Sequence, residues 1–255
     1  MLVTGCIVTF KNNPEVVQQV IKSFQNTELN VKLYIVDNSP TNELSSLAKD
    51  DNVEYIFNPS NPGFGAAHNI AIKKSIEIKS TYHVVLNPDI YFDSFALDRM
   101  VTFMNKHLDC GQLMPKILYP TGEVQYLCKK NPTLVDLFLR RFMPSSLQKF
   151  FKNRMDSFEY KDKNYDEIIF DVPYFSGCFM FFRTSILKNI GGFDEKIFMY
   201  IEDADITRRM LEVSRTVYYP KATVYHHYAK GSYNNIKLMF YNIHGAFVYF
   251  KKWGL

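Results

Sequence analysis

The amino-acid sequence predicts an α/β fold, with one open, mostly parallel β-sheet that carries helices on both faces. Between residues 2 and 107, short β-prone runs alternate with stretches of helical periodicity, which is typical of right-handed β-α-β units. Most of these runs are nearly continuously apolar, as in strands that are covered on both faces. A composition of 47% hydrophobic and 22% charged residues over 255 positions suits a packed globule with a sizeable core.

The predicted elements of the first half follow one another regularly. Residues 2–10 form a central strand, and a helix begins at Pro14, because proline is favoured at the first helical position. Apolar residues recur at helical spacing after Pro14, so this helix packs one face on the sheet. The next elements are a strand at 31–36, a weaker helix at 43–49, a strand at 53–57, a loop at 58–65, a helix at 66–78, a strand at 82–86 and a helix at 94–107 with Ser94 as its N-cap.

After residue 107 the alternation stops. Residues 120–170 contain turns, aromatic residues and a basic cluster at 129–154, so we expect an inserted basic and aromatic helical segment there. The elements expected after the insertion are a strand at 174–183, a short helix closed by Gly191 and Gly192, a helix that starts at 202–205, a strand near 215–219 and a final helix near 234–252.

Net charge and cysteine content restrict the possible setting only slightly. A net charge of +4 permits binding to diphosphates, polyanions or an anionic membrane surface without selecting among them. The four cysteines are scattered without metal-binding spacing, which favours a reduced cytoplasmic setting. No window approaches the roughly 18 uninterrupted apolar residues of a membrane span, so we expect a soluble or peripheral protein.

Polar residues follow three of the predicted strands, at the position where ligands bind in open α/β sheets. A carboxylate there can accept hydrogen bonds from a ribose or offer oxygen to a divalent cation. Solvated turns are an equal alternative, because Asp, Asn and Ser are common turn formers. The residues are Thr9 after the first strand, Asp37 and Asn38 after the second, and Asn87 and Asp89 after the fourth.

Two further groups of residues could carry chemistry. Glu202, Asp203 and Asp205 lie within four positions, and such crowding is unfavourable without a cation or a proton-transfer role. The alternative is an acidic helix start that the helix dipole favours. His226 and His227 end a β-like stretch, where one of them could bind a metal or a diphosphate, although histidines in general are more often core or surface residues.

Taken in order, seven motifs resemble the glycosyltransferase family 2 proteins of the GT-A fold, especially a bacterial rhamnosyltransferase-like branch that builds surface polysaccharides. The resemblance covers residues 2–232. The motifs are IVTFKN at 7–12, VDNSP at 36–40, NPGFGAAHN at 61–69, LNPDI at 86–90, SGCFMFFR at 176–183, GGFDEKIFMYIEDADITRR at 191–209 and HHYAKGS at 226–232.

The resemblance assigns roles to individual residues. The family's D-x-D metal motif stands here as Asn87-Pro88-Asp89, which leaves Asp89 as the expected ligand of Mg²⁺ or Mn²⁺, with His227 favoured over His226 as a second contact. Asp203 is the expected catalytic base, with Glu202 beside it. The expected donor-binding residues are Thr9, Asp37, Asn38, Asn61, Gly63, Gly65, Asn69, Asn87 and Asp89, and the expected acceptor-binding residues are Gly177, Cys178 and Glu202.

The resemblance also implies one GT-A-like domain at 1–255. It divides into a nucleotide-binding half at 1–119, the insertion at 120–170, an acceptor and catalytic half at 171–233 and a C-terminal helix at 234–255. The expected reaction is inverting, metal-dependent transfer of rhamnose or a hexose from a dTDP- or UDP-linked donor to a saccharide acceptor. We expect the acceptor to be lipid-linked and expect no nucleic-acid partner.

Segment 129–154 combines aromatic and basic residues, so we expect it to contact the cytoplasmic face of the inner membrane peripherally. A core-facing helix with a solvated edge is an equal alternative. We expect the C-terminal helix to pack on the domain or on a second subunit, which makes a homodimer possible.

Two other functions compete with glycosyl transfer. A sugar-phosphate nucleotidyltransferase would usually carry a glycine-rich basic loop after its first strand, whereas residues 9–14 contain no glycine. A non-catalytic nucleotide-sugar-binding protein would have no need of Glu202, Asp203 and Asp89 together.

Overall fold

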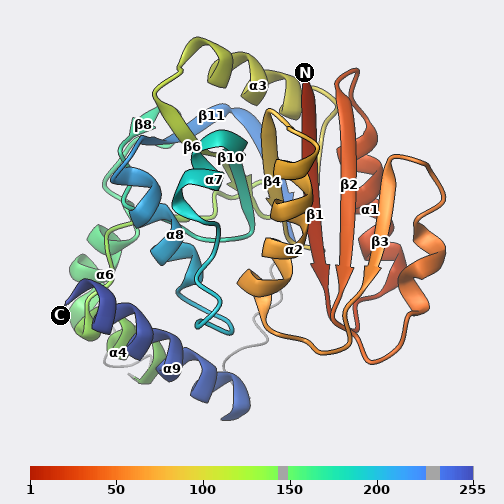
Figure 1. The fold of residues 1–255 in the computed structure, drawn as a ribbon. Coiled ribbons are helices and arrows are strands. Elements are labelled where there is room, and N and C mark those ends of the chain that lie inside the picture. Colours follow the sequence, from red (N-terminus) through yellow and green to blue (C-terminus); the bar gives the residue numbers. More distant parts are fainter. Residues whose placement is uncertain (143–148, 228–235, 255) are drawn as a thin grey trace.

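A computed structural model describes residues 1–142, 149–227 and 236–254, and its architecture is the mixed α/β fold that the sequence predicts (Figure 1). The strands of the main sheet are β1 (Leu2–Thr9), β2 (Asn30–Asp37), β3 (Val53–Phe57), β4 (Tyr82–Leu86), β5 (Ile90–Phe92), β6 (Cys110–Leu118), β8 (Ile169–Phe170), β10 (Phe179–Arg183) and β11 (Arg215–His226). Within the described residues these nine strands follow the order β3-β2-β1-β4-β10-β6-β11-β5, and β8 pairs with β11 beside that path.

The sheet is parallel at one end and mixed at the other. β1 pairs in parallel with β2 and β4, and β2 pairs in parallel with β3. β10 is antiparallel to both of its neighbours, and β5 and β8 are antiparallel to β11. The predicted parallel arrangement of β1 to β4 is thus confirmed. At the other end of the sheet, β5, β8 and β10 run in the opposite direction.

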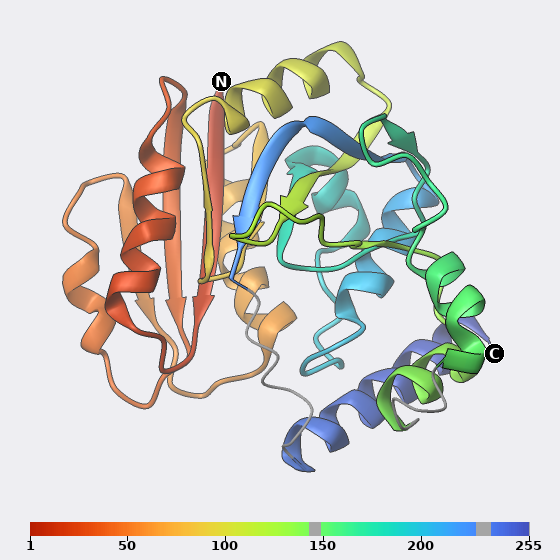
Figure 2. The same cartoon turned by 180° about the vertical axis from the view of Figure 1, so that it is seen from behind.

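The two ends of the sheet are covered by different helices. α1 (Pro14–Gln25) and α2 (Phe64–Glu77) lie on opposite faces of β1 and β2, as the two views show (Figures 1 and 2). α1 begins where the sequence predicts, and its N-cap Asn13 accepts a hydrogen bond from the Glu15 N–H at 2.8 Å. The weak helix expected at 43–49 is a 3₁₀ turn, η1 (Glu43–Leu47).

The helix after β5 starts later than predicted. α3 (Ala96–Lys106) has Phe95 as its N-cap residue, without a capping side chain. The Phe95 N–H donates to Asp93 Oδ1 at 2.9 Å, so the prediction of Ser94 as N-cap is wrong. Asp93 holds the turn that precedes the helix instead.

The strand expected at 174–183 is interrupted. Its first part is β9 (Tyr174–Phe175), which pairs with β7 (Cys128–Lys129) in a separate two-stranded sheet, and its second part is β10. The chain turns at residues 176–178, where the Gly177 N–H donates to Asp203 at 2.9 Å instead of to a neighbouring strand. The prediction of one continuous strand is therefore wrong.

The chain after β10 supplies the helices on the second half of the sheet. α7 (Thr184–Ile190) ends at Gly191, whose φ of 80° provides the left-handed cap that the sequence predicts. α8 (Glu202–Leu211) begins at the acidic cluster, as expected. Side chains of α2, α7 and α8 share one apolar cluster against β4 and β10.

Helices of the insertion and the C-terminal helix lie together at the lower left of Figure 1. The insertion contains α4 (Leu134–Phe142), η2 (Lys149–Phe151) and α6 (Lys152–Phe158), and residues 143–148 lie outside the described residues. α9 (Ile236–Trp253) lies beside α4 in both views (Figures 1 and 2). Tyr249 and Phe250 of α9 are buried in a cluster with Leu137 of α4, so the expected packing of this helix on the domain is confirmed.

The described helices include none that is both long and apolar enough to cross a bilayer. All four cysteines are buried and free.

Candidate active site

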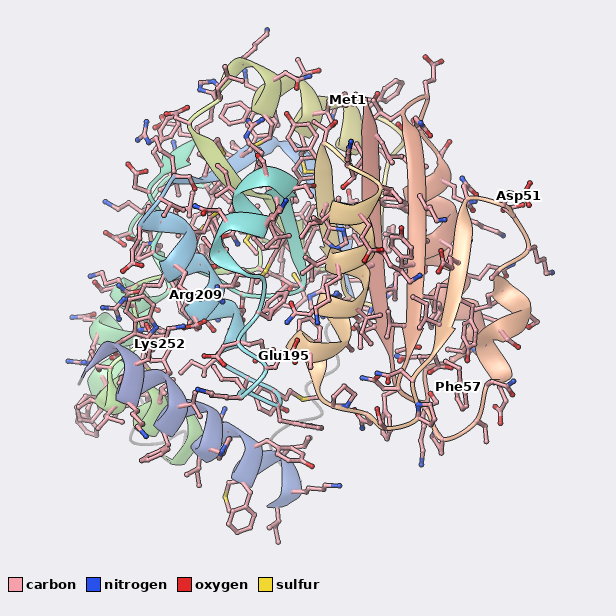
Figure 3. All side chains as sticks on the ribbon, viewed as in Figure 1. Met1, Asp51, Phe57, Glu195, Arg209 and Lys252 are labelled. Carbon is pink, nitrogen blue, oxygen red and sulfur yellow. The ribbon has the colours of Figure 1, made fainter. Side chains whose placement is uncertain are left out.

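The carboxyl ends of β1, β2 and β4 meet at one rim of the sheet. Thr9 is opposite Asp37 in the β1–β2 register, and Ile7 is opposite Leu86 in the β1–β4 register. The residues that follow these strands therefore gather at the same edge, as the sequence predicts. The loop between α7 and α8 reaches this edge, where Figure 3 shows Glu195 close to the start of α2.

Asp37 ends β2 as a fully buried carboxylate with three hydrogen-bond donors. Thr9 Oγ1 donates to Asp37 Oδ1 at 2.9 Å, and the Ser39 N–H donates to the same oxygen at 3.0 Å. The Tyr55 hydroxyl donates to Oδ2 at 2.7 Å. Burial and the adjacent Asp37 raise the pKa of Tyr55, which keeps this phenol a donor. The resemblance assigns Thr9 and Asp37 to donor binding, whereas the sequence gave no signal for Tyr55 or for the contact between Thr9 and Asp37.

The neighbouring turn is also held by amide side chains. Asn58 Nδ2 donates to Asn38 Oδ1 at 2.7 Å, and the Asn38 N–H donates to the Thr9 carbonyl at 2.9 Å. Asn38 is buried by these contacts, and its predicted contact with the nucleotide-sugar donor stays a prediction.

Gly63 and Gly65 allow α2 to approach the loop between α7 and α8 closely. Gly63 has a φ of 108°, and a Cβ atom there would clash with the carbonyl oxygen of Phe198. A Cβ atom on Gly65 would lie 2.8 Å from the Cβ of Phe193. Only glycine fits these two positions without displacing that loop.

Asn69 fastens the same loop to α2. Its Nδ2 donates to the Phe193 carbonyl at 2.9 Å and to Glu195 Oε1 at 3.0 Å, and its Oδ1 accepts from the Phe193 N–H at 2.9 Å. Asn61, with a φ of 45°, lies in the turn before α2. The structure thus shows loop contacts for Gly63, Gly65 and Asn69, and their predicted contact with a nucleotide remains a prediction.

The Asp89 side chain contacts His226, whereas the resemblance favours His227 as the second metal contact. The Asp89 Oδ1 and His226 Nε2 atoms are 3.3 Å apart, and Gln125 Oε1 lies 2.9 Å from the other ring nitrogen. Burial alone would lower the pKa of His226, but Cys178 and Asp89 beside the ring outweigh burial and raise the pKa to about 10. The ring therefore lies between two oxygen atoms, Asp89 Oδ1 and Gln125 Oε1.

His227 is exposed at the end of β11. Its N–H donates to the Asp89 carbonyl at 3.0 Å, and its ring lies 5.4 Å from the Tyr91 ring. Ser232, the partner motif position of His227, lies outside the described residues. The structure places both histidines next to Asp89, the first through its side chain and the second through its backbone.

A cleft of about 640 Å³ lies between the rim of the sheet, the insertion and α9. Of the predicted site residues, its lining includes Asn87, Gly177, Cys178, Glu202 and Asp203, together with His226. Thr9, Asp37, Asp89 and His227 are not among its lining residues, and His226 connects Asp89 to the cleft. The insertion contributes Gln125, Tyr126, Lys129, Leu137 and Lys161, Tyr119 lies just before it, and α9 contributes Leu238 and Asn242.

Asp203 projects from the first turn of α8 into this cleft. Its Oδ2 accepts from the Gly177 N–H at 2.9 Å and from the Tyr174 hydroxyl at 3.3 Å. A Cβ atom on Gly177 would lie 3.2 Å from the Asp203 Cβ, so the turn and the helix are closely packed. Burial raises the pKa of Asp203, although Lys129 and these donors oppose that shift.

Glu202 is less well compensated than Asp203. Its side chain is buried, and Oε2 has no hydrogen-bond partner among the residues that the structure describes. Burial and the adjacent Asp203 raise the pKa of Glu202 well above its usual value. Two carboxyl groups with raised pKa values in one cleft are suited to hold and release a proton.

The backbone before α8 is strained. Tyr200 and Ile201 both have a positive φ, of 72° and 68°, which is rare for a bulky residue and rarer still for a β-branched one. Each such residue costs on the order of 1–3 kcal/mol. The strained pair brings Glu202 and Asp203 to the cleft at the first turn of the helix.

Asp205 points away from Asp203, toward the side of α8 that faces α9. Its carboxylate contacts Arg209 at 2.8 Å, Lys252 at 2.8 Å and the Trp253 indole N–H at 2.9 Å. Figure 3 shows Arg209 on α8 and Lys252 on α9 on the sides by which the two helices face each other. Despite burial, these partners lower the pKa of Asp205.

The residues around Asp89 fit a shared rather than a self-contained cation site. The described residues contain no group of three or more His, Cys, Asp or Glu side chains that could hold a metal ion together. Mg²⁺ is usually bound through one or two carboxylates and substrate phosphates. Asp89 is about a quarter exposed, so its carboxylate can supply one ligand to a cation that a diphosphate also holds.

Three residues that line or support the cleft were not found from the sequence. Tyr174 and Lys129 contact or influence Asp203, and Gln125 orients His226. Lys129 and Gln125 belong to the insertion, whose path depends on long-range packing. The pairing of β7 with β9 places Lys129, and the hydrogen bond from Gln125 Nε2 to the His226 carbonyl places Gln125; no local pattern signals either contact.

Comparison with known proteins identifies related sequences. The family model described as "Glycosyl transferase family 2" matches residues 6–191. The N-acetylglucosaminyl-diphospho-decaprenol L-rhamnosyltransferase of Mycobacterium tuberculosis is 27% identical over 233 residues, which cover 87% of this chain and 75% of that protein. The rhamnosyltransferase WbbL of Escherichia coli K12 is 23% identical over 88% of this chain and 82% of its own.

A solved structure shows the same fold. GalNAc-T7, crystallised with UDP, GalNAc and Mn²⁺, superposes with a TM-score of 0.68 at 14% sequence identity and covers 91% of this chain. This chain spans 44% of that protein chain, so the likeness concerns one part of a larger molecule.

Proposed function

The chain belongs to glycosyl transferase family 2, and from this premise we propose that it transfers a rhamnosyl or hexosyl group from a nucleotide sugar to a saccharide acceptor with inversion at the anomeric carbon. The family, the GT-A fold and the glycosyltransferase activity predicted from the sequence are confirmed. The inversion, the donor nucleotide and the acceptor form the proposal.

One observation carries the proposed mechanism, namely the position of Asp203. Its carboxylate lies in the cleft, and burial raises its pKa. An acceptor hydroxyl that attacks an anomeric carbon must lose a proton, and a carboxylate within hydrogen-bond reach can accept it. The Gly177 N–H and the Tyr174 hydroxyl both hold Oδ2, so the carboxylate has a fixed orientation for this transfer.

The donor side of the proposal lies at the rim formed by β1, β2 and β4. Asp37, held by Thr9 and Tyr55, would bind the ribose or base of the donor. Asn87 lines the cleft and Asp89 follows it, which suits contact with the diphosphate. A Mg²⁺ or Mn²⁺ ion on Asp89 would neutralise charge that develops on the leaving diphosphate.

The acceptor side is formed by the insertion. Tyr126 of the insertion and Tyr119 just before it line the cleft, and the charge of Lys129 acts on Asp203. The printed name of the mycobacterial relative describes a sugar on a diphospho-decaprenol carrier. We therefore propose that the acceptor is a lipid-linked saccharide and that the enzyme uses it at the cytoplasmic face of a membrane. In this proposal residues 1–119 form the nucleotide-binding half and residues 171–233 the catalytic half.

Release of nucleoside diphosphate tests this function. The full chain should be incubated with dTDP-rhamnose and UDP-hexoses, each with and without Mg²⁺ or Mn²⁺ and a polyprenyl-diphosphate saccharide. We expect release that requires both a metal ion and an acceptor, and a product with inverted anomeric configuration by NMR. Formation of sugar nucleotide from sugar phosphate and nucleoside triphosphate would identify a nucleotidyltransferase, and donor binding without turnover would identify a non-catalytic protein.

The Asp89→Ala variant tests the cation site separately. We expect it to lose the response of activity to Mn²⁺, because a carboxylate ligand is removed. If turnover of the wild type persists in excess chelator and the variant matches the wild type, the proposed metal dependence is wrong.

A further inference from the structure

The outer face of α9 carries an exposed apolar stripe. Ile236, Phe240, Ile243 and Phe247 expose 71%, 62%, 48% and 66% of their surface. Their spacing of four, three and four residues places them on one face of the helix. Isolated exposed apolar residues are normal, whereas a contiguous row of four large ones on one helix indicates an interaction surface.

The charge of α9 is of one sign. Residues 236–253 contain no Asp or Glu, and exposed Lys237, His244 and Lys251 lie along one flank of the stripe. Lys252 points elsewhere, to Asp205. A helix with an apolar face and basic residues on its polar flank is the form that binds in the interface of an anionic bilayer.

The inner face of the same helix belongs to the enzyme. Tyr249 and Phe250 are buried against the domain, and a Cβ atom on Gly245 would lie 2.8 Å from the Tyr200 carbonyl oxygen. Leu238 and Asn242 line the cleft. One helix thus separates the cleft that contains Asp203 from the exposed apolar stripe.

We propose that the stripe formed by Ile236, Phe240, Ile243 and Phe247 docks on the headgroup region of an anionic lipid bilayer. Docking would place the edge of the cleft at the lipid surface, since Leu238 and Asn242 lie on the same helix. In this proposal α9, and not segment 129–154, makes the main contact with the membrane. Leu137 of that segment packs under α9, while Leu134 and Val135 of α4 remain about half exposed beside it.

A second copy of the chain fits this face less well than lipid does. In a two-fold dimer the same patch contacts itself. If the two copies of α9 pack antiparallel, their basic flanks lie on the same side of the contact and Lys237 would approach Lys251 of the other copy, while the helix offers no acidic residue to compensate them. Anionic headgroups supply that compensation for each Lys near the surface. The proposal does not depend on the transfer reaction, because binding to lipid needs neither donor nor acceptor.

Co-sedimentation of the full chain with vesicles tests the proposal. The vesicles are phosphatidylcholine alone and phosphatidylcholine mixed with phosphatidylglycerol. We expect the wild type to bind the anionic vesicles, and the Phe240→Ser/Phe247→Ser variant to bind them at least about tenfold more weakly. Lys251→Glu should weaken binding in low salt and approach the wild type in high salt, because salt screens the charge.

Phe95→Ser is the matched control. Phe95 is also 62% exposed, but it lies at the start of α3, at the opposite end of the molecule from α9 (Figures 1 and 2). We expect this variant to bind vesicles as the wild type does. Equal binding of wild type and Phe240→Ser/Phe247→Ser would overturn the proposal, as would equal binding to neutral and anionic vesicles.

Two measurements keep the result interpretable. Thermal unfolding should show that Phe240→Ser/Phe247→Ser remains folded; if it does not, Lys251→Glu alone decides, because it removes no buried contact. Sedimentation equilibrium without lipid should show a monomer. A dimer that Phe240→Ser/Phe247→Ser dissociates would show that a second copy covers the stripe and would contradict lipid docking.

Discussion

The two sides of α8 treat buried acidic groups in opposite ways. On the side that faces α9, Asp205 contacts Arg209, Lys252 and Trp253, and these partners lower its pKa. On the side that faces the cleft, Asp203 and Glu202 have raised pKa values, and within the described part of the chain one Glu202 oxygen has no hydrogen-bond partner. The paired carboxylate of Asp205 stabilises the position of the helix. The carboxyl groups of Asp203 and Glu202 have fewer compensating partners, and such groups are suited to exchange a proton.

Asp203→Asn should produce the largest change. It removes the proposed base without altering the size of the side chain, so we expect kcat to fall by roughly 10²- to 10⁴-fold. Turnover measured as nucleoside diphosphate release with acceptor present checks this. Asp205→Asn is the comparison on the other side of the helix, and its folded fraction should keep most of its activity; a similar loss in both variants would erase the distinction between the two sides.

Asp205→Ala should have the largest effect on stability. The substitution leaves Arg209 and Lys252 without their carboxylate, and breaking a buried ion pair costs about 3–5 kcal/mol. Urea unfolding measures the loss. Asp194→Ala is the control, since Asp194 contacts the same Lys252 only at 3.7 Å; a loss as large as that of Asp205→Ala would contradict the proposed difference.

Lys129→Met should shift the pH dependence of activity. Burial raises the pKa of Asp203 and Lys129 opposes this, so removal of Lys129 raises the pKa further. A base must be deprotonated, so kcat/KM falls as the pH falls through this pKa, and the acidic limb should move to higher pH. The adjacent Lys130→Met serves as control, because Lys130 is exposed and contacts Ser157 instead. An unchanged limb in Lys129→Met would show that another group is the base.

Glu202→Gln should have the smallest effect. Because burial and Asp203 raise the pKa of Glu202 in the folded state, its ionisation lowers stability as the pH rises above about 4.5 and through the raised pKa. The variant should therefore be more stable than the wild type at neutral pH and equally stable near pH 4. Unfolding at both pH values checks this, with exposed Glu212→Gln as control. A gain independent of pH would argue against a charge effect.

Sequence reasoning located the first half of the fold well because its signals are local. β1 to β4, α1 and α2 follow apolar runs and helical spacing, and the residues after their strands reach one rim as expected. The second half depends on contacts between distant segments. β6 was missed, since Pro115 within it argues against a central strand. The irregular pairing between Tyr219 and Thr223 of β11 accommodates it.

The candidate site shows the same division. Asp203, Glu202 and Asp89 were found because acidic residues after apolar runs are conspicuous in a sequence. Their partners Tyr174, Lys129 and Gln125 come from the insertion and the small sheet, where only the folded chain brings them near. The choice between His226 and His227 also depends on the direction of β11 at its end, which places His226 and not His227 against the Asp89 carboxylate.

The affinity of Asp203→Asn for nucleoside diphosphate, measured by titration calorimetry with Mn²⁺ present, bears most directly on the role of the cleft. If Asp203 accepts the proton of the acceptor, the variant should bind the nucleotide within a few-fold of the wild type while turnover is lost. Nucleotide binding that disappears together with turnover would show that Asp203 holds the donor or the fold, and the assignment of the base would be wrong.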